Sequence, residues 1–211
     1  MRRLPVYLLI ETAGGMRGER IEAVKNGLQV LVSKLRQDPF ALESVYISII
    51  RFDRQASEVL PLTSLEELQI PDIQIPEASP PHTGEALRFL CQKVNEDVAR
   101  GSAEEKGDWR PLLFLLTRGV PADKEVFKQI LPIVKSKNFA TIVACTAGSH
   151  SADNEMKQLT DQVVHLDTAD SATLASFFKW VSSSVSSGNM HVSNTDELQL
   201  PAPPPEVQPV L

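Results

Sequence analysis

Cysteine is scarce in this sequence and long apolar runs are missing, and each shortage excludes a class of protein. The 211 residues include two cysteines, Cys91 and Cys145, each within an apolar segment. Neither stands beside a second cysteine or a nearby histidine, so the spacing indicates neither a disulfide framework nor a zinc site and favours a reducing cytoplasm. No stretch approaches the roughly 20 apolar residues that a membrane-spanning helix needs. We therefore expect a soluble, cytoplasmic protein with no membrane association.

Positive charge is also in short supply. Lys and Arg number 21 against 27 Asp and Glu, which gives a formal net charge of -6. Proteins that bind a phosphate backbone concentrate Lys and Arg on one face, and no basic run of that kind occurs here. This balance argues against nucleic acid as a partner.

Catalytic and nucleotide-binding motifs are missing as well. Neither G-x-G-x-x-G nor G-x-x-x-x-G-K occurs, and no serine lies in a G-x-S-x-G elbow, although Ser149, Ser151 and Asp153 are close to His150 in sequence. His150, His165 and His191 have no metal-ligand spacing to His82 or to a cysteine, so we interpret the histidines as surface or structural residues. We predict that the chain is not an enzyme and holds no cofactor.

Apolar segments alternate along the chain with two different periods. Continuous apolar or β-branched runs predict strands at 6–10, 45–52, 58–62, 111–117, 140–145 and 163–166. Apolar positions recurring every three or four residues predict helices at 18–36, 83–100, 123–137 and 171–187. This order predicts a doubly wound α/β fold, with a mainly parallel six-stranded sheet, one antiparallel edge strand and helices on both faces.

A single domain over residues 1–190 and a Pro-rich tail over residues 191–211 are predicted. The tail has polyproline II character, which leaves open whether it is a plain terminus, contacts a partner or packs back on the domain. If it packs back, its anchors are Leu198, Leu200 and Val207. In doubly wound sheets ligands bind beyond the carboxyl ends of the strands, so we expect function in the loops that begin at Glu11, near Thr83 and at Arg118.

These loops and the elements around them contain the stretches LPVYLLIETAGGMRGERIEAVKNGLQVLVSKLRQDP, ISIIRFD, HTGEAL and GDWRPLLFLLTRGVPAD. In these stretches the sequence resembles the von Willebrand A family, and in particular bacterial tellurium-resistance proteins of the TerY type. The resemblance covers about residues 3–190. It implies a metal-ion-dependent adhesion site, with D-x-S-x-S after the first strand, a Thr before the second helix and an Asp in a T-D-G turn. Such hydroxyls and carboxylates are hard oxygen ligands suited to magnesium.

This sequence departs from that metal-site pattern at nearly every ligand. The stretch Glu11-Thr12-Ala13-Gly14-Gly15 stands where the family has D-x-S-x-S, so Ala13 and Gly15 offer no side-chain oxygen. Thr117-Arg118-Gly119 replaces T-D-G, which puts a cation in the place of an anion, and only Thr83 is unchanged. We predict that the site has lost its divalent metal.

Two arrangements of the altered site remain open at this point. In the first, Arg118 and Glu11 form a salt bridge across the vacated site, because a guanidinium matches a carboxylate with two hydrogen bonds. In the second, the site has drifted, and Arg118 and Glu11 both face solvent.

The resemblance implies a protein-interaction module in bacterial tellurite, stress or phage defence. Its implied partners are a Ser/Thr kinase, a phosphatase or a related von Willebrand A protein. The expected contact rim consists of Glu11, Thr12, Met16, Arg17, His82, Thr83 and Arg118. Two alternatives are an anion site for phosphate or carboxylate built around Arg118, and a residual magnesium-dependent adhesion domain.

Overall fold

The computed structural model describes residues 2–75, 79–102, 104–191 and 199–210. Its strands are β1 (Leu4–Glu11), β2 (Val45–Phe52), β3 (Ala56–Ser64), β4 (Leu112–Thr117), β5 (Thr141–Ala147), β6 (Val163–Leu166) and β7 (Gln208–Pro209). Its α-helices are α1 (Glu19–Leu35), α2 (Pro39–Ser44), α3 (Thr83–Asp97), α4 (Lys124–Ser136), α5 (Asp153–Leu159) and α6 (Ser171–His191). Two 3-10 turns, η1 (Gly14–Met16) and η2 (His150–Ala152), follow β1 and β5.

The sheet has the order β3-β2-β1-β4-β5-β6-β7 and is parallel except at its two edges. The doubly wound α/β class is confirmed. The prediction of six strands with one antiparallel edge strand is wrong, because the sheet has seven strands and both edge strands are antiparallel. The seventh strand, β7, comes from the Pro-rich tail and pairs antiparallel with β6. Two residues, one of them proline, carry no strand signal of their own, so this strand forms only because β6 presents an open edge.

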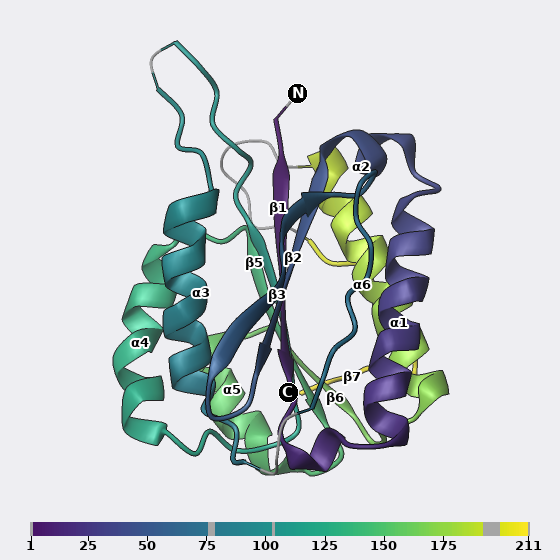
Figure 1. The fold of residues 1–211 in the computed structure, drawn as a ribbon, viewed down its shortest axis with the longest axis vertical. Helices are drawn as coiled ribbons and strands as arrows, with labels where there is room; N and C mark the ends of the chain where they lie inside the picture. Colours follow the sequence, from purple (N-terminus) through teal and green to yellow (C-terminus); the bar gives the residue numbers. More distant parts are fainter. Residues whose placement is uncertain (1, 76–78, 103, 192–198, 211) are drawn as a thin grey trace.

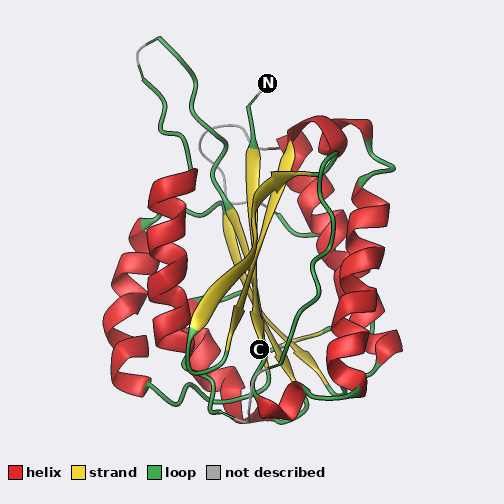
Figure 2. Cartoon of the chain, in the orientation of Figure 1, coloured by secondary structure: helices red, strands yellow, loops and turns green. Residues whose placement is uncertain are grey.

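Alternate residues of β1 supply two separate cores, one on each face of the sheet. Leu4, Val6, Leu8 and Ile10 pack with α1 and α6, whereas Tyr7 and Leu9 pack with α3 and α4. All eight residues of β1 are buried, as expected of a central strand covered on both faces. Figures 1 and 2 show the helix pairs α3/α4 and α1/α6 on opposite sides of the sheet.

The described part of the tail packs on the domain. Trp180 Nε1 donates to the Pro201 carbonyl at 2.9 Å, and Val210 N donates to the Val163 carbonyl at 2.9 Å. Of the three expected anchors, Val207 is 1% exposed and Leu200 packs against the core, while Leu198 lies outside the described residues. Among the described residues, none of the helices has the length and apolar character to cross a membrane.

Val207→Ala is expected to lower the free energy of unfolding by about 2 kcal/mol, because it removes buried methyl groups and leaves a small cavity. Chemical denaturation followed by circular dichroism measures the change. Val210→Ala, at a partly buried tail position, is the matched control and should cost clearly less. Equal and negligible effects of the two substitutions would mean that the tail does not pack on the domain in solution.

Candidate functional site

The carboxyl ends of β1 and β4 open into a pocket of about 470 Å³. Its walls come from the β1 loop with η1, from the segment before α3 and from the loop after β4. The lining residues are Glu11, Ala13, Gly14, Gly15, Ser79, Pro80, Pro81, Arg118 and Gly119. The two loops predicted after β1 and β4 therefore meet. They lie beyond the carboxyl ends of the strands, where doubly wound folds bind ligands.

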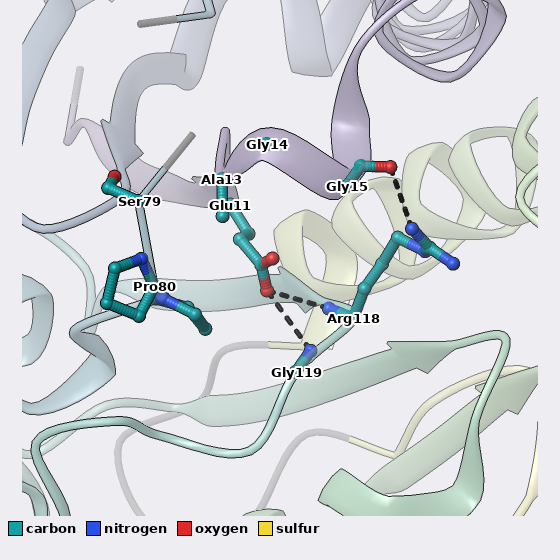
Figure 3. A pocket seen from close by; sticks show the side chains of 9 residues that line it. Glu11, Ala13, Gly14, Gly15, Ser79, Pro80, Arg118 and Gly119 are labelled. Carbon is teal, nitrogen blue, oxygen red and sulfur yellow. Dashed lines mark hydrogen bonds between the residues drawn. The ribbon is translucent and has the colours of Figure 1, made fainter. Parts of the chain in front are cut away.

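Glu11 is buried in the floor of this pocket, with 3% of its surface exposed. Its Oε2 accepts hydrogen bonds from Thr117 Oγ1 at 2.6 Å, from Arg118 N at 2.8 Å and from Gly119 N at 3.3 Å. Figure 3 shows the two backbone contacts. A buried carboxylate is tolerated only when such donors replace water, and here they fasten the end of β1 to the loop after β4.

The guanidinium of Arg118 turns away from Glu11 toward η1. Its Nη1 donates to the Gly15 carbonyl at 2.7 Å (Figure 3). A Cβ atom on Gly15 would lie 2.9 Å from Nη1, and one on Gly148 would lie 3.2 Å from Nη2. The guanidinium therefore occupies a slot that these two glycines leave open.

The predicted salt bridge between Glu11 and Arg118 is wrong. Among the described residues no ion pair joins the two side chains, and the contact is made by the backbone N–H of Arg118 instead. The start of this loop lies directly beside the carboxylate, so the main chain reaches it first and the long side chain extends past it. The alternative of a freely solvated pair is wrong as well, because Glu11 is buried and Arg118 is hydrogen bonded.

Positive charge gathers around the Gly15 carbonyl. Arg20 Nη1 donates to the same oxygen at 3.0 Å, so two guanidinium groups share one acceptor. Partial burial and the charge of Arg20 lower the pKa of Arg118, whereas Glu11 opposes this shift. Nε of Arg118 is buried and has no hydrogen-bond partner within the described structure. The pocket rim is thus cationic and retains an unused donor.

The donor set does not fit the magnesium site that the resemblance implied. Magnesium requires near-octahedral oxygen coordination, but Ala13 and Gly15 supply no side-chain oxygen. The inner oxygen of Glu11 already accepts three hydrogen bonds, and a guanidinium lies at the rim. Thr83 Oγ1 is buried and has no hydrogen-bond partner in the described structure. It is the one side-chain oxygen of the implied magnesium site that this sequence retains unchanged.

Besides Glu11, three more residues of the expected contact rim are buried. Met16 is 1% exposed within the core, while Thr12 and Thr83 are 0% exposed. Thr12 Oγ1 donates to the Phe52 carbonyl at 3.2 Å, because the chain after β1 stays paired with the end of β2. By contrast, Arg17 is exposed and His82 is partly exposed, so both lie at the surface.

Asp123 is a positioning residue that the sequence reasoning missed. Its carboxylate accepts from Gly84 N at 3.1 Å and from Glu85 N at 2.8 Å, so a residue next to α4 caps the start of α3. The cap fixes the turn that carries Thr83. Its position at the end of the stretch GDWRPLLFLLTRGVPAD was the only signal in the sequence.

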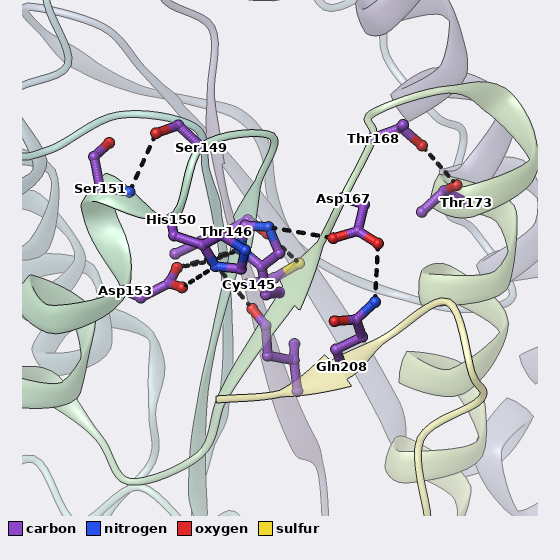
Figure 4. A network of polar contacts seen from close by, with 12 residues as sticks. Cys145, Thr146, Ser149, His150, Ser151, Asp153, Asp167, Thr168, Thr173 and Gln208 are labelled. Atoms are coloured by element: carbon purple, nitrogen blue, oxygen red, sulfur yellow. Dashed lines mark hydrogen bonds and ion pairs between the residues drawn. The ribbon is translucent and has the colours of Figure 1, made fainter. Parts of the chain in front are cut away.

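A second polar cluster, also missed, lies at the ends of β5 and β6 (Figure 4). His150 Nδ1 lies 2.7 Å from Asp153 Oδ2, and His165 Nδ1 lies 3.3 Å from Asp153 Oδ1. Thr146 Oγ1 contacts both Asp153 Oδ1, at 2.5 Å, and His165 Nδ1, at 2.9 Å. Burial tends to raise the pKa of Asp153, but hydrogen bonds from Thr146 and His150 outweigh it and hold that pKa below its ordinary value. Strand pairing of Thr146 with His165 creates this cluster, and spacing along the chain does not reveal it.

Comparison with known proteins gives a family match and a set of similar folds. The model of the von Willebrand factor type A domain matches residues 6–179. No curated protein matches the sequence. A structure of proximal thread matrix protein 1 from the mussel byssus is 12% identical with a TM-score of 0.66, and the alignment covers 86% of this chain and 48% of that one.

Two further solved structures extend the likeness. A von Willebrand factor type A protein from Catenulispora acidiphila is 14% identical with a TM-score of 0.62, covering 88% of this chain and 43% of that chain. The pilus adhesin SpaC from Lactobacillus rhamnosus GG, in an open conformation, is 12% identical with a TM-score of 0.64, covering 86% and 30%. The present chain thus spans less than half of each of these three proteins, and at such identities the likeness is one of fold.

Proposed function

Because this chain belongs to the von Willebrand factor type A family, we propose that it is a non-catalytic protein-interaction module that works without a divalent cation in its pocket. Domains of this family commonly serve protein–protein interaction or adhesion. The contact surface is the pocket at the ends of β1 and β4. The sequence resemblance to TerY-type proteins supports a cytoplasmic role in bacterial tellurite, stress or phage defence, with a kinase, a phosphatase or a related von Willebrand A protein as the partner.

The position of Arg118 carries this proposal. In the family's metal site a cation offers a free coordination position to a partner's carboxylate. Here the guanidinium brings a permanent positive charge to the same pocket, held by the Gly15 carbonyl and flanked by Arg20. Its Nε is buried and has no hydrogen-bond partner in the described structure, so the charge of the guanidinium is only partly compensated. We propose that an acidic side chain of the partner binds there.

Once bound metals have been removed with EDTA, added magnesium is expected to leave the melting temperature of the wild-type protein unchanged. The variant carrying Ala13→Ser, Gly15→Ser and Arg118→Asp should gain stability with magnesium. The three substitutions are compatible because removal of the guanidinium clears the space that a Cβ atom on Gly15 needs. Differential scanning fluorimetry measures both proteins, and a ligand present at 100 times its Kd adds about 2.7 kcal/mol of stability.

The matched control for this experiment carries Arg118→Asp alone. It introduces the carboxylate without the two hydroxyls, so it should respond to magnesium less than the triple variant does. Stabilisation of the wild-type protein by magnesium would contradict the proposal and identify a cation-dependent adhesion domain.

The partner is tested by comparative affinity capture from the source organism with wild-type, Arg118→Asp and Arg88→Asp proteins. Arg88 lies on the exposed face of α3 with Glu85 and matches the change in charge away from the pocket. A partner of the pocket is retained by wild-type and Arg88→Asp proteins and lost with Arg118→Asp. Its acidic residues are then substituted in turn in the purified complex.

A second candidate function is binding of a small anion. The observation that favours it is the pair of guanidinium groups on the Gly15 carbonyl at a pocket of small-molecule size. Inorganic phosphate would then stabilise the wild-type protein and fail to stabilise Arg118→Gln. If phosphate has no effect on either protein, phosphate binding is excluded and the protein-interaction proposal stands.

A further inference from the structure

We propose that His150, Asp153 and His165 form a binding site for a zinc-like transition-metal ion, separate from the pocket of Arg118. Each residue offers one ligand atom, and the three atoms lie within 4.8 Å of one another. Two imidazoles and one carboxylate are a common set for zinc sites that keep an open fourth position. This inference does not depend on the proposed function.

The distances between these ligand atoms suit a small ion. Zinc bonds of 2.0–2.2 Å in a tetrahedron place the ligand atoms about 3.3 to 3.6 Å apart. His165 Nδ1 lies 3.3 Å from Asp153 Oδ1, and His150 Nδ1 lies 2.7 Å from the other carboxylate oxygen, Oδ2. An ion between them displaces the hydroxyl of Thr146 from its contacts with Oδ1 and with His165 Nδ1. His150 must therefore move outward by several tenths of an ångström and turn from its stacked position over the ring of His165, where the ring centroids are 3.7 Å apart.

The surroundings of the cluster allow that movement and give an entry path. The His150 side chain is 69% exposed and lies on the short turn η2, so it can rotate without disturbing the core. Asp153 and His165 are buried at 5% and 1% exposure and provide the fixed half of the site. An ion can thus reach the buried carboxylate from solvent past one mobile ligand.

The outer contacts of His165 support the proposal independently. Its Nε2 is buried without a hydrogen-bond partner in the described structure, although Asp167 Oδ1 lies 3.9 Å away. A metal ion on Nδ1 requires the proton to sit on Nε2, where it faces that carboxylate. Metal-bound histidines usually donate their second N–H to a carboxylate, and here the exposed side chain of Asp167 must move closer to close the gap of 3.9 Å. Gln208 of β7 holds Asp167 through a hydrogen bond of 2.9 Å, which connects the tail to the site (Figure 4).

The test is a zinc titration of the full chain, measured by isothermal titration calorimetry after bound metals have been removed with a chelator. Wild-type protein is expected to bind one zinc ion, and His150→Ala should weaken binding by about 100-fold or more, since even outer contacts contribute 10–100-fold. His150 is exposed, so this variant is expected to fold. His82→Ala removes a histidine outside the cluster and should bind zinc as the wild type does.

Two further measurements keep the outcome decisive. Asp153→Asn preserves the shape of the buried side chain and should also lose zinc, and circular dichroism shows whether it folds. Cobalt should give a tetrahedral visible spectrum without a thiolate charge-transfer band, which excludes Cys91 and Cys145 as ligands. The proposal is overturned if the wild type binds no zinc, or if His150→Ala binds it as tightly as His82→Ala.

Discussion

Glu11→Ala is expected to lower the free energy of unfolding by about 3 to 4 kcal/mol, although the residue is not a member of either hydrophobic core. The substitution removes one buried anion that accepts from three donors, Thr117 Oγ1 and the backbone N–H groups of Arg118 and Gly119. Thr117 Oγ1 and Gly119 N keep only longer contacts, of 3.3 Å to the Gly119 carbonyl and of 3.4 Å to Thr117 Oγ1. A hydrogen bond to a charged group contributes about 1.5 to 3 kcal/mol, and water entering the open pocket offsets part of the loss. Urea denaturation followed by tryptophan fluorescence measures the effect.

Two variants separate the charge of Glu11 from its shape. Glu11→Gln keeps one carbonyl acceptor and should cost about 1 to 2 kcal/mol, clearly less than the alanine substitution. Glu43→Ala removes an exposed carboxylate on α2 and should stay within about 0.5 kcal/mol of wild type. If Glu11→Ala proves as mild as Glu43→Ala, then Glu11 does not fasten β1 to the loop after β4.

The central part of the fold could be predicted because its signals are local. The unbroken apolar run of β1 and the three-to-four residue spacing in α1 each identify one element without reference to the rest of the chain. β7 could not be predicted in this way. Its two residues owe their strand conformation to the open edge of β6 and to the burial of Val207, which are properties of the folded molecule.

The positions of the site could be predicted, but its contacts could not. Strand order places Glu11 and Arg118 at the carboxyl ends of two neighbouring strands, and both line the pocket. Whether the main chain or the side chain of Arg118 contacts Glu11 depends on how close the backbone of the loop after β4 comes to the carboxylate. The direction of its guanidinium depends on space left by Gly148, which is distant in sequence. The His150 and His165 cluster depends in the same way on the register of β5 and β6.

Close helix packing also determines the site, and it leads to the second large effect. A Cβ atom on Gly84 would lie 2.4 Å from Phe127 N and 2.7 Å from Phe127 Cα, so the backbones of α3 and α4 leave no room for a side chain. Gly84→Ala must therefore separate the two helices and disturb the hydrogen bond from Gly84 N to Asp123. We expect a loss of about 3 kcal/mol or more, at the upper end for overpacking, measured by urea denaturation.

Gly27→Ala is the matched control, because it makes the same change within a helix against a different obstacle. There the added Cβ would lie 2.2 Å from Cδ2 of the Phe178 ring, a side chain that can shift, rather than from backbone. Gly27→Ala, in the interior of α1, also gains about 1 kcal/mol of helix propensity, whereas Gly84 is the second residue of α3 and gains less. Gly27→Ala should therefore cost less than Gly84→Ala. Equal costs would show that α3 and α4 can separate as easily as one ring can turn, and that the start of α3, with Thr83 at the pocket, is not rigidly held.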